Sequence, residues 1–209
     1  MGRGVSSVRG HRSEKESAGD NDMRDASSTV ELLAAERAAL AAAVARVPAE
    51  LRSRSLAPGQ WSIVDVVEHL TRVETGIARL LAKRGRPGES GPVPEGKSFA
   101  DLRLTPELIA HLRDRAHRIE APERVRPSGA ANPATAWEAL EAARGELLRA
   151  FAAADPDALD AVVHEHAVLG PLVLRDWVTF VAHHEARHCA QVAEIADALV
   201  ASGSDASSA

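Results

Sequence analysis

Four stretches of the chain repeat apolar residues every three or four positions, which is the period of a helix that buries one face. Segments rich in glycine and proline separate them, as expected where helices end and turns begin. Pro48 stops the first stretch, and Ser62 and Asp65 have the spacing of a capping box at the start of the second. The predicted helices cover residues 28–47, 62–83, 133–154 and 174–201.

The connections between these helices differ greatly in length. Residues 86–132 are too many for a plain loop in a compact domain. Within them Thr105 can cap a helix with Pro106 at its first position, so a short helix is expected over residues 106–119. So long a connection permits a crossover that leaves the second and third long helices parallel. The sequence predicts an all-α four-helix bundle, with a plain connector over residues 161–173.

Polar segments without a helical period flank the predicted bundle. Residues 1–26 are rich in glycine, serine and charged residues and lack the apolar run of a signal peptide, so we expect a disordered tail. Met23 is an alternative start, just before the first helical pattern. The expected organisation is a bundle over residues 27–201 and a second disordered tail over residues 202–209.

Composition narrows the class of protein. Only 3% of the residues are aromatic, and alanine, leucine and valine dominate, which favours helices packed through small side chains. The formal net charge is −5 and no basic stripe is present, so nucleic-acid binding is not expected. No apolar run is long enough for a membrane helix. The single cysteine, Cys189, excludes an intramolecular disulfide and favours the cytoplasm.

The candidate chemistry lies in the last predicted helix, where His184 and His188 are four residues apart and therefore on one face. They continue an apolar stripe that includes Trp177 and Val181, so they point into the bundle. His69 occupies the apolar stripe of the second helix. Three inward imidazoles would form an open metal site of the kind that enzymes use. The alternative is that all three are hydrogen-bonded core residues.

Residues 184–188 also match the letters H-E-x-x-H of zinc proteases, in which the glutamate is the general base. The longer protease motif is absent. Glu185 is rotated off the direction of the two histidines, so a surface position is favoured over a role as base. Cys189 is interpreted as a small core residue, and Trp61 as a packing anchor or part of a pocket mouth. The other candidates are expected on the surface: Glu68, His111, His117, His164, His166, His183 and Arg187. For His164 and His166 the alternative is that they approach the site as a proton donor or a substrate contact.

Three segments together resemble the DinB-like superfamily, also described as YfiT-like metal-dependent hydrolases. They are W-S-I-V-D-V-V-E-H-L at residues 61–70, A-P-E-R-V-R-P-S-G at residues 121–129, and the segment H-A-V-L-G-P-L-V-L-R-D-W-V-T-F-V-A-H-H-E-A-R-H-C-A-Q-V from residue 166. The resemblance implies an up-down-down-up four-helix bundle, often a homodimer. It also implies a divalent metal ion held by His69, His184 and His188. One departure is Ala167, where relatives often have proline after the histidine.

The resemblance leaves the reaction open. A metal ion on three neutral imidazoles acidifies a bound water or thiol, so both hydrolysis and transfer of a low-molecular-weight thiol to a small-molecule substrate are expected activities. Some relatives resemble thiol S-transferases, which favours the thiol. Zinc or nickel is the expected metal, with iron or copper as alternatives. A metal-binding stress or accessory protein without turnover is the second hypothesis, and a purely structural bundle is the third.

Overall fold

The computed structural model describes the backbone of residues 10–206 and the side chains of residues 26–201. Its long helices are α1 (Gly10–Ala45), α2 (Ile63–Arg84), α4 (Ala136–Ala153) and α6 (Leu174–Ala206). The shorter elements are the helices α3 (Pro106–Arg113) and α5 (Pro156–Ala161), the strands β1 (Val163–His166) and β2 (Gly170–Val173), and the 3₁₀ turns η1 (Ala49–Leu51), η2 (Phe99–Leu102) and η3 (Glu123–Val125).

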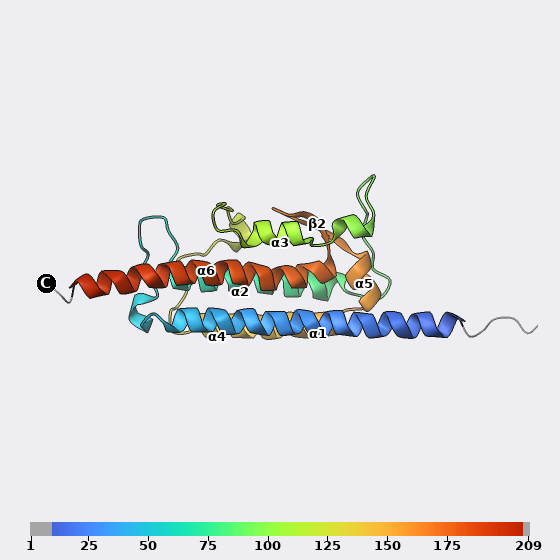
Figure 1. Ribbon diagram of the computed structural model, residues 1–209, viewed down its shortest axis with the longest axis horizontal. Coiled ribbons are helices and arrows are strands. Elements are labelled where there is room, and N and C mark those ends of the chain that lie inside the picture. Colours follow the sequence, from blue (N-terminus) through green and yellow to red (C-terminus); the bar gives the residue numbers. More distant parts are fainter. Residues whose placement is uncertain (1–9, 207–209) are drawn as a thin grey trace, which may run out of the picture.

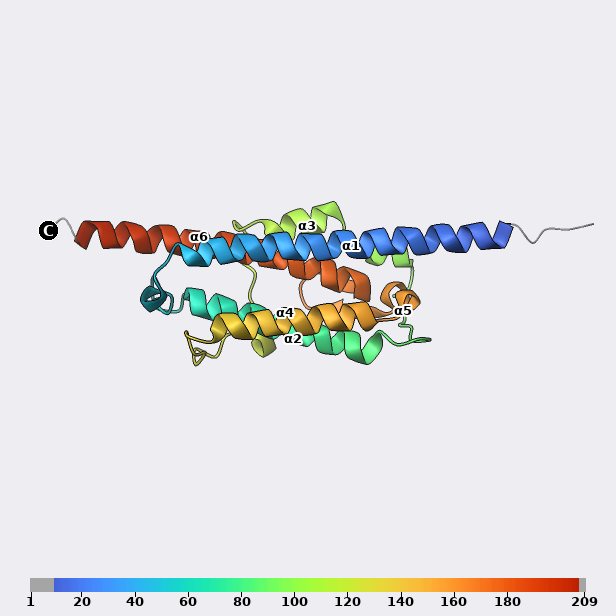
Figure 2. The ribbon, with the colours of Figure 1, turned by 90° about the horizontal axis from the view of Figure 1, so that it is seen from below.

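The long helices form two layers, with α2 and α6 in one and α1 and α4 in the other (Figure 1). Helix α1 packs mainly on α6, and α4 packs mainly on α2. The colour gradient in Figure 2 shows that α2 and α4 run in the same direction, opposite to α1 and α6. This up-down-down-up course needs the long crossover between α2 and α4. The predicted all-α four-helix bundle is therefore confirmed.

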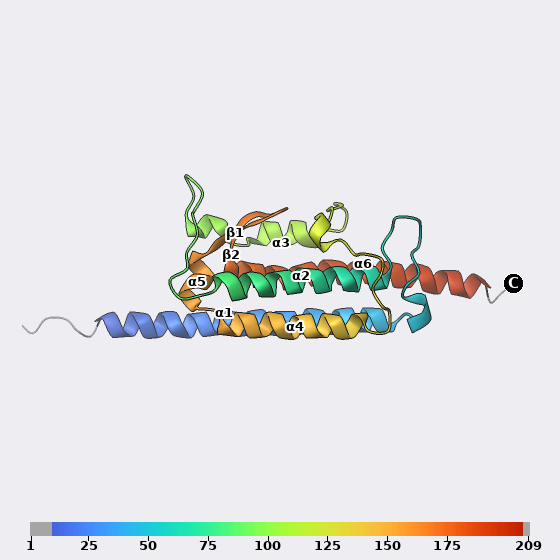
Figure 3. The ribbon, with the colours of Figure 1, turned by 180° about the vertical axis from the view of Figure 1, so that it is seen from behind.

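A third, thinner layer covers the other face of α2 and α6. Helix α3 and the β1–β2 hairpin lie on the side away from α1 and α4, as both Figure 1 and Figure 3 show. Helix α3 contacts α6, and the turn η3 contacts α2. The two central helices are consequently enclosed from both sides. Polar side chains on α2 or α6 can thus face either the bundle core or the space beneath this cover.

The predicted caps position the central helices. The Ser62 hydroxyl accepts a hydrogen bond from the Asp65 amide at 3.2 Å, and the Asp65 carboxylate accepts one from the Ser62 amide at 2.9 Å. This reciprocal pair satisfies two amides at the start of α2. Thr105 caps α3 with a single hydrogen bond, which its hydroxyl accepts from the Leu108 amide at 3.3 Å. Both starts agree with the sequence to within one residue.

Apolar side chains from all four long helices fill the bundle. At one end of the bundle Leu40, Leu70, Leu140 and Val192 are almost completely buried, one from each helix. A second cluster around Leu147 and Val181 extends toward α5 and the hairpin. All of these residues except Leu70 belong to the apolar stripes predicted from the sequence, so amphipathic periodicity accounts for most of the core. None of the described helices combines the length and apolar composition that a membrane span needs.

The connector before α6 is not a plain loop as predicted. Residues 163–173 form an antiparallel hairpin in which Val163 pairs with Val173 and His166 with Gly170. Gly170 has a φ of +77°, which a residue with a side chain rarely adopts. The strands are only four residues long, too short to show a recognisable alternation of apolar and polar residues. The hairpin brings His164 and His166 back over the start of α6.

Two predicted helix ends in the crossover are wrong because asparagine and aspartate side chains form local turns. Helix α3 ends at Arg113 and not near residue 119, since the Asp114 carboxylate accepts a hydrogen bond from the amide two residues on, at 2.8 Å. Helix α4 begins at Ala136, because the Asn132 side chain makes the same kind of turn at 3.0 Å. Such turns compete with helical hydrogen bonding.

Helix α1 begins at Gly10, so the start predicted near Ser28 is wrong. The chain has no proline before Pro48, and nothing in this stretch forces the helix to begin later. Helix α6 likewise continues to Ala206. Residues 1–9 and 207–209 lie outside the described residues. The division into tails over residues 1–26 and 202–209 and a bundle over residues 27–201 stays a prediction.

Candidate metal centre

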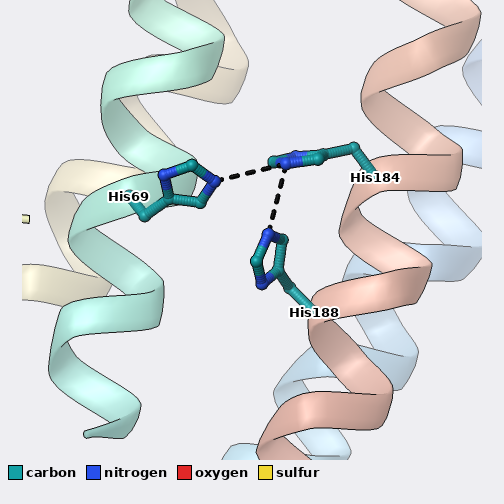
Figure 4. A group of neighbouring side chains, drawn as sticks. All are labelled: His69, His184 and His188. Atoms are coloured by element: carbon teal, nitrogen blue, oxygen red, sulfur yellow. Dashed lines mark hydrogen bonds between the residues drawn. The ribbon is translucent and has the colours of Figure 1, made fainter. Parts of the chain in front are cut away.

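Three imidazoles meet between α2 and α6, on the side covered by the third layer. His69 comes from α2, and His184 and His188 come from successive turns of α6 (Figure 4). The Nε2 atom of His184 lies 3.2 Å from the Nε2 of His69 and 3.2 Å from the Nε2 of His188. All three ligand atoms lie within 4.8 Å of one another. The structure therefore brings together the three histidines singled out in the sequence.

Hydrogen bonds on the far side of two rings fix their tautomers. The Nδ1 of His69 lies 2.8 Å from the Val125 carbonyl oxygen, which only accepts, so this Nδ1 donates. The Nδ1 of His188 donates to the Gln191 side-chain oxygen at 2.8 Å. A neutral imidazole carries one proton. Both Nε2 atoms consequently present a lone pair toward His184, the arrangement found in metal sites whose histidines are oriented by outer hydrogen bonds.

The three imidazoles cannot satisfy all of one another's hydrogen bonds. The Nε2 of His184 can donate a proton to only one of the two facing lone pairs, so one buried acceptor stays unsatisfied. Within the described part of the chain, the buried Nδ1 of His184 has no hydrogen-bond partner either. A metal ion accepts all three lone pairs at once, and N–N distances of 3.2 Å suit bonds of about 2.0–2.1 Å to one ion. The donor set thus fits a divalent metal.

Burial keeps the imidazoles in the form that binds metal. His69 and His188 are buried, and desolvation lowers the pKa of all three histidines below the ordinary value. The effect on the pKa is strongest for His184 and His188, where the neighbouring imidazoles add to it. Because neutral imidazole is the ligand, protons compete little for these nitrogens near neutral pH.

The histidines line a cavity of about 1100 Å³. Its walls come from α2, α6, the segment between α3 and η3, and the hairpin. The Trp61 ring lies 4.9 Å from that of His69, and Phe180 stacks on His184 at 5.0 Å between ring centroids. Trp61 is thus part of the cavity wall, one of its two predicted roles. A cavity of this size accommodates a small molecule beside the three nitrogens.

A model of the DinB superfamily matches residues 32–192, which is most of the chain. The chain belongs to the DinB superfamily. It is also 26% identical over 141 residues to the uncharacterized protein YuaE of Bacillus subtilis (strain 168), and the aligned part covers 67% of this chain and 80% of that protein. No solved structure matches the chain. The DinB region contains all three histidines, and their binding of metal stays a prediction at this point.

Within this DinB bundle, Glu185 has neither of the roles considered for it. Its side chain is completely buried, which contradicts the favoured surface position, and it does not line the cavity. The carboxylate accepts hydrogen bonds from Arg37 Nε at 2.5 Å and from Arg144 at 2.6 Å. Being one residue past His184, it leaves α6 about 100° away and points into the core. The letters H-E-x-x-H do not describe a protease site here.

Glu185 belongs to a network of four buried charges, one from each long helix. Glu74 on α2 accepts from Arg37 at 2.7 Å and from Arg144 at 2.8 and 3.0 Å. The two carboxylates and two guanidinium groups balance in charge. Glu74 and Arg144 were not singled out in the sequence. The available signal was a charged residue inside or beside each apolar stripe, such as Arg37 on α1.

For His166 the favoured surface position is wrong, and the structure agrees with the alternative that this residue approaches the site. The hairpin folds it over α6, where its ring lies 4.9 Å from Trp177 and 4.5 Å from Phe180. It lines the cavity, and desolvation lowers its pKa to about 4. The Nδ1 accepts from the Val168 and Leu169 amides at 3.2 and 3.1 Å. The proton of the neutral ring is therefore on Nε2. His164 is exposed, as predicted, and also lines the cavity.

Two more predicted surface residues of α6 hold the third layer in place. His183 is buried and accepts a hydrogen bond from Arg113 Nε at 3.1 Å. Arg187 is buried and donates to the carbonyls of Leu112 at 3.1 Å and His117 at 2.6 Å, and also to that of Asp114. A helix face that looks polar in sequence is thus an interface with α3.

The remaining candidates lie largely where the sequence placed them. His111 and His117 are exposed, as predicted. Glu68 is half-buried and accepts from Arg72 and from the Ser128 hydroxyl at 2.8 Å, so it fastens the crossover to α2. Cys189 is half-buried and packs against the apolar cluster of the bundle. It is not among the grouped ligand atoms of the described residues.

Proposed function

We propose that this protein is a metal-dependent enzyme that activates a low-molecular-weight thiol or a water molecule at His69, His184 and His188. The convergence of three Nε2 atoms, two of them fixed as acceptors, carries the proposal. A structural histidine cluster does not need two lone pairs directed at a third ring. When bound, a divalent ion with open positions lowers the pKa of a thiol or water so that a nucleophile forms near neutral pH.

The surrounding residues support a reaction on a small molecule. Trp61 and Phe180 pack against the imidazoles and shield them from bulk water. His166 lines the same cavity with its proton on Nε2, because backbone amides occupy its Nδ1. This N–H is available to donate a hydrogen bond to an oxygen of the substrate on which negative charge develops.

The position of Glu185 favours the thiol over water as the nucleophile. Hydrolysis by an H-E-x-x-H site uses the glutamate as base beside the metal. Here that carboxylate is committed to Arg37 and Arg144 on the other side of α6. A thiol would need no such base, because a divalent ion held by His69, His184 and His188 would lower its pKa enough for the proton to pass to solvent near neutral pH. We infer that transfer of a thiol to an electrophilic small molecule is the reaction to test first.

The test combines metal analysis with a screen of thiols and electrophiles. We expect about one equivalent of zinc, nickel or a related divalent ion per chain in the wild type and in His183→Ala, and little in His184→Ala. The neighbouring His183 is a matched control because it faces Arg113 and not the cluster. Thiol transfer by the first two proteins and not by His184→Ala supports the enzyme. Metal without turnover leaves the non-catalytic metal-binding protein, and no metal refutes both.

A further inference from the structure

The cavity carries more positive than negative charge, although the whole chain has a formal net charge of −5. Among the described residues, five arginines and three glutamates line it. Three of those arginines are already engaged. Arg115 pairs with Glu194 at 2.7 Å, Arg126 lies 3.8 Å from Glu120, and Arg187 donates to backbone carbonyls. The remaining two arginines determine what the cavity attracts.

Arg118 and Arg124 line the cavity without an ion pair or hydrogen bond to any described residue. Arg124 is in the turn η3, next to Val125, whose carbonyl orients His69. The positive charge of Arg124 also lowers the pKa of the facing His166. The third glutamate, Glu165, leaves strand β1 on the face opposite to His166. Arg124 therefore lines the cavity without an ion pair to a described residue, one position before the residue whose carbonyl orients His69.

We propose that the cavity takes a small molecule with a carboxylate group, which Arg124 binds while the reacting atom of the molecule faces His69, His184 and His188. The proposal rests on the function proposed above and adds the class of ligand. A guanidinium presents two parallel N–H donors that match the two oxygens of a carboxylate. Arg118 adds a second positive charge on the same wall and attracts the same group.

The experiment compares two probes that differ in one group, 3-mercaptopropanoate and its uncharged amide. Each is titrated into the full-length protein loaded with Co²⁺, and binding is followed by the sulfur-to-cobalt charge-transfer absorption. We expect the carboxylate to bind at least about tenfold more tightly than the amide. In Arg124→Gln this ratio should fall to about one. The matched control is Arg79→Gln, an exposed arginine of α2 outside the cavity, which should keep the tenfold ratio.

The failures of the two proposals are distinguishable. Equal affinities of the wild type for the two probes, or a ratio unchanged in Arg124→Gln, overturn the carboxylate site and leave the metal centre intact. Absence of the absorption with both probes, in protein that holds cobalt, overturns thiol activation. In that case the Nε–H resonance of Arg124, assigned by its loss in Arg124→Gln, decides the carboxylate site in metal-free protein. It should shift with propanoate and not with propanamide, and no shift with propanoate overturns the proposal.

Discussion

Two polar clusters face opposite sides of the central layer, and neighbouring residues of α6 contribute to both. His184 turns toward the cavity with His69 and His188, whereas Glu185 turns into the bundle with Arg37 and Arg144. The inner cluster also contains Glu74 and balances two carboxylates with two guanidinium groups. The outer cluster consists of neutral imidazoles with two lone pairs facing one ring.

The two clusters differ in role: the inner one contributes to the fold, and the outer one is the candidate for activity. The inner cluster satisfies itself, because each carboxylate accepts from both arginines and each long helix contributes one charge. Such a network adds little net stability over an apolar core, yet it penalises any register of the helices that leaves one charge alone. In the outer cluster, one imidazole lone pair has no donor among the described residues. A cluster completed only by something bound is the better candidate for activity.

The largest expected effect comes from removing one charge of the inner cluster. Glu185→Gln keeps the size of the side chain but leaves Glu74 as the one buried carboxylate opposite the guanidinium groups of Arg37 and Arg144, beside the exposed Glu141 that also pairs with Arg37 at 2.9 Å. We expect the free energy of unfolding to fall by about 3–5 kcal/mol, measured by urea denaturation of metal-free protein. The control Glu194→Gln, which breaks an exposed ion pair on the same helix, should cost less than about 1 kcal/mol.

The metal content of Glu185→Gln tests whether the two clusters are independent of each other. Folded Glu185→Gln protein should bind metal as the wild type does, because Glu185 does not line the cavity. A loss of metal without a loss of helical structure would show that the two clusters are coupled through α6. A loss of stability below about 1 kcal/mol would mean that water or a shifted proton already compensates the charge.

The second-largest effect is the stabilisation expected when the outer cluster binds a metal ion. Metal binds the folded state preferentially, so it should raise the free energy of unfolding by about 2.7 kcal/mol at a hundredfold excess over its dissociation constant. A strong chelator at pH 7.5 should remove this increment from the wild type and leave His184→Ala unaffected. The metal-free bundle should stay folded, because its apolar core does not include the cluster. Unfolding on chelation would instead make the metal part of the fold.

Local patterns in the sequence predicted that the four long helices exist, although not where α1 and α4 begin, and they predicted part of the site. The caps at Ser62 and Thr105 depend on residues three positions apart, so their starts were readable. The pair His184 and His188 follows from helical spacing on an apolar stripe. The convergence of His69 with them was expected from its stripe and from the family resemblance, since the period alone does not say which distant helix lies opposite.

The parts that were missed depend on contacts between distant segments. A charge inside a stripe, such as Arg37, signals a buried partner, but Glu74 and Arg144 become its partners only after three helices pack. His166 looked like a loop residue because four-residue strands leave no clear period. His183 likewise looked exposed, because the cover by α3 is a property of the crossover and not of α6.

An intermediate effect is expected from the residue that fixes the tautomer of His188. Gln191→Leu removes the acceptor of the Nδ1 proton, so the Nε2 lone pair is no longer held toward the cluster. Loss of such an outer hydrogen bond should weaken metal affinity about 10- to 100-fold, measured by competition with a chelating dye. Gln191→Glu retains an acceptor oxygen and should restore most of the affinity. Equal weakening in both variants would point to packing rather than to the tautomer.

The smallest expected effect tests whether the cavity holds His166 neutral. The pKa of His166 is about 4 in the folded protein, below the value of about 6.5 for an unfolded chain. Between these values the unfolded chain binds a proton at His166 and the folded chain does not, so stability is complete above about pH 6.5 and declines as the pH falls toward 4.

His166→Asn keeps an acceptor for the amides of the hairpin and cannot titrate, so the metal-free variant should lose less stability than the metal-free wild type between pH 7 and pH 4.5. Because the ring is partly exposed, solvent screening reduces the difference to about 1–2 kcal/mol, and each kcal/mol corresponds to about 2–4 °C in Tm. The remaining histidines are common to both proteins and cancel in the comparison. Parallel curves of Tm against pH would show that the pKa of His166 is the same in the folded and the unfolded protein, and the claim that the cavity lowers this pKa would then have to be abandoned.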